Sequence, residues 1–232
     1  MRRLILPIGA GGVAIIGLGM AMSTPPDAFQ GDFARIFHVH VPSSWIAFLA
    51  FFVTALGSVA WMVTRRAFWD RLAAASAEVG VLFTGAALLT GSLWGKPVWG
   101  KFWDWGDARL ASTALMFFVY LGYLALRRAT IDPVARARRA SIIGMVAVIQ
   151  VPLVYFSVNL WRSLHQTQTI RPDGASMGPE MLRAFLVNLL AFNLVYVALL
   201  TSRIRLGRLQ EEALTSTVSA GSAITAPRLD PI

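Results

Sequence analysis

Three histidines and one tryptophan-rich segment are the residues of this chain whose types and spacing suggest a ligand site. His38 and His40 lie close together in FHVHVPSSW, and His165 lies far along the chain in NLWRSLHQTQ. Between them, residues 94–110 read WGKPVWGKFWDWGDARL and hold half of the eight tryptophans. Imidazole nitrogens are common metal ligands, and indole rings form broad apolar surfaces. The pattern indicates a binding site with an aromatic wall and imidazole ligands.

The tryptophan segment predicts an irregular, flat and apolar surface. Gly95, Pro97, Gly100 and Gly106 interrupt it and are expected to break regular structure. An aromatic belt at the lipid headgroups accounts for one or two tryptophans, but four within twelve residues exceed what membrane anchoring requires. The four are Trp94, Trp99, Trp103 and Trp105. Such a surface suits a large planar ligand that lies near the bilayer.

Two opposed histidines would complete a site for a metal macrocycle. His165 lies just beyond the end of one expected helix, and His38 and His40 lie at the start of another. Two neutral imidazoles facing each other across a planar macrocycle are the axial arrangement that haem iron accepts, whereas zinc prefers three or four ligands. Asp104 and Asp107 could add carboxylates, so zinc is not formally excluded. The density of indoles favours the flat organic ligand.

His38 and His40 compete for one of these two places. In an extended chain their side chains would point the same way, and at a helix start they would diverge. Pro42 is expected in the first turn of that helix, where its missing N–H costs little. Spacing alone does not choose between the two histidines.

Charged residues share the tryptophan segment. Lys96, Lys101 and Arg109 are candidates to pair with the two propionates of a haem. Asp104 and Asp107 are expected to pair with Lys101 or Arg109, although exposed pairs of this kind are weak.

The elements that must position these residues are membrane helices. Of the 232 residues, 56% are hydrophobic and 14% charged, against about a quarter charged in soluble domains. Six segments are apolar over about the 20 residues that a spanning helix needs. They are Leu4–Met22, Trp45–Val63, Leu72–Leu93, Leu110–Leu126, Ser141–Leu160 and Met181–Thr201. We predict an all-α integral membrane protein, with residues 1–209 as one six-helix domain. Its first segment is longer than a signal-peptide core and is expected to be retained.

Arginine and lysine predict the orientation of the helices, because they concentrate on the cytoplasmic side. Thirteen lie at one end of the predicted bundle: Arg2, Arg3, Arg65, Arg66, Arg71, Arg127, Arg128, Arg136, Arg138, Arg139, Arg203, Arg205 and Arg208. The other end has seven. Both termini are therefore predicted to be cytoplasmic, and residues 23–44, 94–109 and 161–180 to lie outside. The bias largely explains the net charge of +9 without a nucleic-acid partner. Residues 210–232 are predicted to be a disordered cytoplasmic tail.

The segment WGKPVWGKFWDWGDARLAS resembles the WWD domain of the haem-handling membrane proteins of cytochrome c maturation. Within that superfamily, the six spans, the His40-Val41-Pro42 sequence and the Leu164-His165-Gln166 sequence resemble the CcmC family, the haem exporter protein C family. The larger relatives CcmF and CcsA have more spans. The family usually reads Trp-x-Trp-Asp-x-Arg, so that Gly106 is an inserted residue here.

The resemblance implies the role of each candidate residue. It places the two axial ligands of the haem iron on His40 and His165, and leaves His38 outside the motif. The aromatic platform falls on Trp94, Trp99, Trp103 and Trp105, with Asp107 and Arg109 as the acidic and basic members of the motif.

The resemblance also implies a carrier that is not an enzyme. Such a protein holds haem b transiently and without a covalent bond at the outer face of the bacterial cytoplasmic (inner) membrane, and presents it to the haem chaperone CcmE. Its other partners are the small protein CcmD, the CcmA–CcmB ABC transporter and membrane lipid. The chain has no glycine-rich phosphate loop with a lysine, which excludes an ATPase site of that kind. The absence of cysteine excludes thioether attachment of haem to this chain.

Two other functions compete with this one. A b-type haem membrane oxidoreductase would typically have histidine pairs inside its helices, whereas these histidines are expected in outer loops. A small-solute transporter would have polar residues near mid-membrane. The candidates are Gln150, Asn159, Asn188 and Asn193, and such side chains more often hydrogen-bond to neighbouring helices. Pro152 is expected to kink its helix.

Overall fold

The computed structural model describes residues 2–167, 169–171 and 174–225 of the chain, and they are almost entirely helical. The long helices are α1 (Arg2–Met22), α2 (Phe37–Thr64), α3 (Ala67–Trp99), α4 (Ala108–Ala129), α5 (Pro133–Ala147), α6 (Gln150–Leu160) and α7 (Pro179–Thr225). A short 3₁₀ helix, η1 (Asp32–Ile36), precedes α2, and β1 (Ile170–Arg171) pairs with β2 (Gly174–Ala175) before α7.

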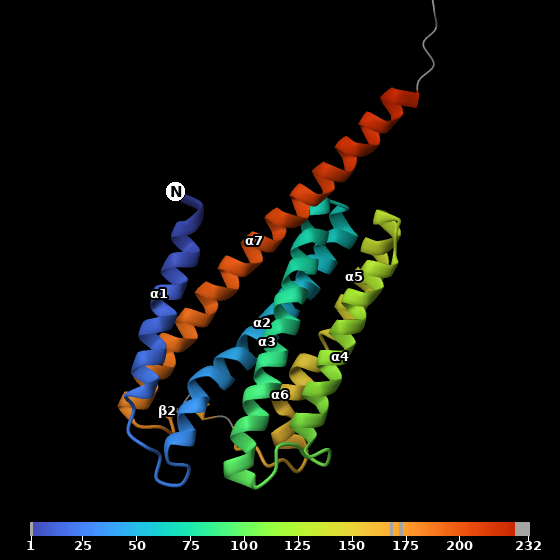
Figure 1. Ribbon diagram of the computed structural model, residues 1–232. Coiled ribbons are helices and arrows are strands. Elements are labelled where there is room, and N and C mark those ends of the chain that lie inside the picture. Colours follow the sequence, from blue (N-terminus) through green and yellow to red (C-terminus); the bar gives the residue numbers. More distant parts are fainter. Residues whose placement is uncertain (1, 168, 172–173, 226–232) are drawn as a thin grey trace, which may run out of the picture.

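Six helical stretches of the described chain are long and apolar enough to cross a membrane. They are Leu4–Met22, Asp32–Thr64, Ala67–Trp99, Ala108–Ala129, Pro133–Leu160 and Pro179–Ala213. The predicted all-α fold with six spans is therefore confirmed. Helices α2 and α3 form the centre of the bundle, with α1 and α7 on one side and α4, α5 and α6 on the other (Figure 1). The start of α1 and the end of α7 lie at the same end of the bundle.

Small and aromatic residues let the central helices approach closely. The ring of Phe51 in α2 stacks on Tyr120 in α4, with 3.5 Å between ring centroids and 10° between planes. Gly80 in α3 lies under the same phenylalanine, where an added Cβ would lie 2.5 Å from Cε1 of Phe51. Small residues at such contacts are typical of membrane helices, because the backbones must come near each other to pack.

A buried amide joins the outer helices α1 and α7. Asn188 in α7 is fully buried and donates through Nδ2 to the carbonyl of Gly17 in α1, at 2.7 Å. Asn193 donates to Leu189 of its own helix at 2.7 Å. Asn188 thus joins two helices, as expected for a polar residue in a span, whereas Asn193 bonds within α7. Neither asparagine lines the cavity described below.

The Arg-rich end of the bundle is crossed by ion pairs. Arg127 of α4 makes a bidentate pair with the buried Asp70 of α3, at 2.6 and 2.8 Å. Helix α7 adds a pair between Arg203 and Glu78 and reaches α3 again through Glu211, whose carboxylate pairs with Arg71 at 2.6 Å. Arg71, Arg127 and Arg203 thus link α3 to α4 and to α7.

The helix expected over residues 141–160 is divided. Helix α5 ends at Ala147 and α6 begins at Gln150. Pro152 has no N–H to donate to the carbonyl of Val148, which instead accepts from Val151 at 3.0 Å. The helix that Pro152 was expected to kink is thus interrupted in the turn before this proline.

Three expected boundaries differ from the structure. Helix α2 begins at Phe37, so that both nearby histidines are helical and Pro42 lies beyond the first turn. Helix α3 continues to Trp99, so that the first third of the segment 94–110 is not irregular. Gly95 packs against the Trp99 ring and Gly100 ends the helix with a positive φ of 77°. Of the tail predicted over 210–232, the described part continues α7 to Thr225, and 226–232 lie outside the described residues.

Candidate functional site

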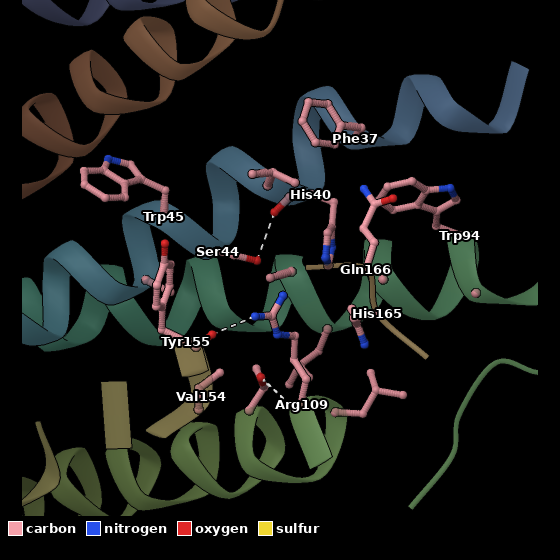
Figure 2. A pocket seen from close by; sticks show the side chains of 18 of the residues that line it. Phe37, His40, Ser44, Trp45, Trp94, Arg109, Val154, Tyr155, His165 and Gln166 are labelled. Atoms are coloured by element: carbon pink, nitrogen blue, oxygen red, sulfur yellow. Dashed lines mark hydrogen bonds between the residues drawn. The ribbon is translucent and has the colours of Figure 1, made fainter. Parts of the chain in front are cut away.

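A cavity of about 570 Å³ opens at the end of the bundle opposite the Arg-rich end, within the usual range for ligand pockets. It lies among α2, α3, α4, α6, the segment that follows α6 and the first turns of α7. Figure 2 shows His40, His165 and Trp94 toward one end of it, and Trp45 and Tyr155 at the other. The predicted site residues among its lining are His40, Trp94, Trp99, Arg109 and His165.

His40 reaches the cavity from α2 and rests on two small residues of α3. Its Nδ1 lies 3.1 Å from Oγ1 of Thr90. Because that hydroxyl donates its own proton to the carbonyl of Ala86 at 2.7 Å, it accepts from Nδ1–H of the imidazole. Gly91 lies against the ring, and an added Cβ there would be 2.8 Å from Cε1 of His40. The lone pair of His40 is therefore on Nε2.

His165 comes from the segment after α6. As in His40, acceptors of the protein lie beside its Nδ1. Its Nδ1 lies 3.3 Å from Oγ of Ser163 and 3.3 Å from Oδ1 of Asp107. The Ser163 hydroxyl donates to Oδ2 of Asp107 at 2.8 Å, so it too can only accept from Nδ1–H. Burial lowers the pKa of His165 below its ordinary value, in spite of the carboxylate nearby. The neutral ring therefore also has its lone pair on Nε2.

Asp107 joins the start of α4 to the segment that holds His165. It is 2% exposed and caps α4 by accepting from the N–H of Leu110 at 2.9 Å. Its other oxygen accepts from the Ser163 hydroxyl and from the N–H of Leu164. Burial opposes ionisation, but the bonds from Leu110, Leu164 and Ser163 outweigh it and lower the pKa of Asp107. This carboxylate is thus charged and fixed in place.

Each cavity histidine has an indole beside it. The ring of Trp94 lies edge-to-face with His40 at 5.8 Å between centroids, and its Nε1–H donates to Oε1 of Gln30 at 2.9 Å. Trp99 approaches His165 at 4.8 Å between centroids. Both indoles project from the last turns of α3, and both line the cavity.

The other two tryptophans of the predicted platform do not line the cavity. Trp103 and Trp105 lie edge-to-face with each other at 5.1 Å, and Trp105 is 72% exposed. The chain turns away from the cavity after α3 ends. Asp104 stabilises this turn by accepting from the Lys101 ammonium at 2.8 Å and from the N–H of Gly106 at 2.9 Å. The hydrogen bond from Lys101 is the main cause of the lowered pKa of Asp104.

Arg109 is the cation of the cavity among its described lining residues. It does not pair with Asp107 as one expectation had it, and its Nη2 donates to the carbonyl of Tyr155 in α6 at 2.9 Å (Figure 2). Its buried Nε has no hydrogen-bond partner within the described part of the chain. Lys96 donates to the carbonyl of Gly100, and the expected pair of Lys101 with Asp104 is present. The two lysines therefore face away from the site.

His38 lies on a different side of α2 from His40. It is fully buried and edge-to-face with Phe37 at 5.6 Å, and it does not line the cavity. Neither ring nitrogen has a hydrogen-bond partner among the described residues. Since α2 begins at Phe37, the two histidines diverge as residues two apart do on a helix.

Several residues that build the site were not identified from the sequence. Thr90 and Gly91 hold His40, Gln30 holds Trp94, and Trp45 lines the far end of the cavity. A signal exists for Gly91, because it lies one helical turn before Gly95 and close to Trp94. Zinc would need a third ligand, and no group of three or more His, Cys, Asp or Glu side chains comes together among the described residues.

The fold and the site define a multi-pass membrane protein with an apolar cavity at one end, two histidines in it and an arginine beside them. Residues 3–219 match the family model described as CcmC, Heme exporter protein C. The chain belongs to this family.

Curated relatives cover most of the chain. It is 37% identical over 229 residues to "Heme exporter protein C" of Bradyrhizobium diazoefficiens, covering 97% of this chain and 85% of that protein. It is 35% identical over 191 residues to the protein of the same name from Escherichia coli K12, covering 82% and 76%. It is 35% identical over 214 residues to a "Putative cytochrome c biosynthesis ccmC-like mitochondrial protein" of Arabidopsis thaliana, covering 91% and 80%.

Proposed function

We propose that the cavity holds haem as a transient cargo, with His40 and His165 as the two axial ligands of its iron. The observation that carries the proposal is that both histidines line one cavity and that each has Nδ1 beside a polar group of the protein. Each ring turns Nδ1 toward an acceptor of the protein, and each therefore keeps the Nε2 lone pair that an iron needs. The relatives named Heme exporter protein C support haem as the cargo. The haem would be haem b, held without a covalent bond.

The rest of the cavity suits the other parts of the macrocycle. The indoles of Trp94 and Trp99 and the apolar side chains of α2, α3 and α4 would bury one face and edge of the porphyrin. The Arg109 guanidinium, with its buried Nε unpartnered among the described residues, would anchor a propionate. Asp107 would act through His165 and not on the haem itself. Trp103 and Trp105, outside the lining, would form an exposed surface beside the site.

The cavity end of the bundle is proposed to face the outside of the bacterial cytoplasmic (inner) membrane. The basis is the charge bias, because the Arg-rich end carries thirteen basic residues against seven. Both termini would then be cytoplasmic. Bound haem would lie at the outer surface, where a chaperone from that compartment reaches it.

The protein would act as a carrier in cytochrome c maturation and not as an enzyme. It would position haem, leave one edge open and hand the group to CcmE, in concert with CcmD and the CcmA–CcmB transporter. The chain would supply ligand positions and orientation, while the reactive chemistry would belong to the haem and to the chaperone.

The test is an absorption spectrum of the purified protein and of three histidine variants. The wild type should show a low-spin haem with two nitrogen ligands. His40→Ala and His165→Ala should each lower haem occupancy without preventing membrane insertion. His38→Ala is the matched control, since its ring lies outside the cavity, and it should leave the spectrum unchanged. Loss of haem in His38→Ala with retention in His40→Ala would refute the ligand assignment.

A further inference from the structure

The two cavity histidines have chemically different partners behind them. Nδ1 of His40 faces the neutral hydroxyl of Thr90 at 3.1 Å. Nδ1 of His165 faces a carboxylate oxygen of Asp107 at 3.3 Å, together with the Ser163 hydroxyl. A histidine that ligates a metal becomes a stronger ligand when a carboxylate accepts its second ring proton, because the ring gains negative charge.

We propose that Asp107 is a positioning residue that makes His165 the stronger of the two iron ligands, and that His40 is the weaker ligand, whose bond breaks first when haem is released. This inference rests on the proposed haem site. It adds an order of bond breaking to it and assigns a role to a residue that does not line the cavity.

The surroundings of Asp107 keep its carboxylate available to His165. It is almost fully buried, and the N–H groups of Leu110 and Leu164 and the hydroxyl of Ser163 all donate to it. These donors come from both α4 and the segment after α6, so that a turn of the carboxylate would break contacts on two elements. A fixed charge beside one ring nitrogen polarises that ring whenever the opposite nitrogen binds a cation.

Thr90 gives His40 much weaker support. Its hydroxyl is neutral, and its proton is already committed to the carbonyl of Ala86. It can therefore orient the ring of His40 but adds no charge to it. A carrier needs one iron bond that yields, and the hydroxyl-backed histidine on α2 is the one that fits this requirement. The haem would then stay attached to His165 on the segment after α6 while its opposite face opens.

Variants that keep one histidine each test this order directly. Full-length protein in detergent is loaded with haemin, and haem loss is followed by transfer to excess apomyoglobin. His40→Ala keeps His165, and His165→Ala keeps His40. The first variant should lose haem at a rate about tenfold lower than the second, or lower still. Adding Asp107→Asn to His40→Ala should erase most of that difference. Adding Thr90→Val to His165→Ala should change the rate much less.

The reduction potential of the bound haem separates positioning from mere folding. Asp107→Asn alone should raise it, because the ferric iron loses the charge donated through His165. If binding weakens tenfold in the ferric state only, the shift is about 59 mV for one electron. Ser163→Ala is the matched control, since it removes a hydrogen bond from the same carboxylate but keeps the charge. It should shift the potential less than Asp107→Asn does.

The outcomes distinguish this inference from the proposed function. If the wild type shows no haem spectrum with two histidine ligands, the proposed function itself fails. If it does, but the two single-histidine variants lose haem at equal rates, the inequality of the ligands is refuted. A potential that moves as far in Ser163→Ala as in Asp107→Asn would refute the role of the carboxylate charge. The expected ranking of rates and potentials supports both.

Discussion

The two ends of the bundle use charged side chains in different ways. At the Arg-rich end, Asp70 and Glu78 on α3 meet arginines from α4 and α7, so that charge joins helix to helix. At the cavity end, Arg109 donates through Nη2 to the backbone carbonyl of Tyr155, and Asp107 accepts from Ser163 and Leu164 of the segment after α6. Charged residues at one end thus join helices, whereas the other end places an arginine and two histidines at a cavity. The comparison predicts that substitutions at the two ends separate stability from haem binding.

Breaking the buried ion pair at the Arg-rich end should have the largest effect. Asp70→Ala leaves the guanidinium of Arg127 buried without its bidentate partner, and removal of one partner of a buried pair costs about 3–5 kcal/mol. The measurement is thermal or denaturant unfolding in detergent. The folded fraction should still bind haem with the wild-type spectrum. A changed haem spectrum in that fraction would mean that the two ends are coupled.

Two glycines of α3 offer a matched pair of smaller effect. In Gly80→Ala the new Cβ meets the stacked ring of Phe51 at 2.5 Å, and overpacking of this kind costs about 1–3 kcal/mol of stability. In Gly91→Ala the Cβ meets His40 at 2.8 Å and should displace the imidazole. We expect the first variant to melt earlier with normal haem affinity, and the second to bind haem more weakly with nearly normal melting. If Gly80→Ala and Gly91→Ala had equal effects on melting and on haemin titration, the assigned position of His40 against Gly91 would be contradicted.

The smallest effect is expected for the cavity cation. Arg109→Gln should weaken haem binding about fivefold, because a partly exposed ion pair is worth at most about 1 kcal/mol. Lys96→Gln is the control, since that ammonium bonds the carbonyl of Gly100 at 3.1 Å, away from the cavity. Haemin titration of both variants, repeated with haem dimethyl ester, checks the reason for the effect. The ester has no propionate charge, so the Arg109 variant and the wild type should bind it equally.

The features that depend on composition and long periodic stretches were predictable from the sequence. The six spans follow from apolar length. The two family motifs select His40 and His165, and both residues line the cavity, while their role as iron ligands stays a prediction. Helix ends were less predictable, because a glycine can either end a helix or leave room for a neighbouring side chain within one. From its type alone Gly95 is expected to break the helix, but it leaves room for the Trp99 ring inside a helix that continues to Trp99.

Contacts between distant segments were not predictable. Trp103 and Trp105 share the motif with Trp94 and Trp99, yet the turn at Gly100 and Asp104 carries them off the cavity. The bond between Asp107 and Ser163 joins residues 56 positions apart. No local pattern encodes such a contact, since it exists only once α4 and the segment after α6 are packed together.

The close contact of the His40 ring with α3 has a further consequence for the rate and the affinity with which a ligand would bind. The imidazole is already oriented by Thr90 and confined by the backbone at Gly91 before anything enters. The ring loses its rotational freedom when the helices pack together. Binding of a ligand would therefore carry no further entropy cost for orienting this ring. If the cavity holds haem as proposed, a ring oriented in advance would meet the iron from a single direction, which would favour flat complexes whose metal has a free perpendicular coordination site.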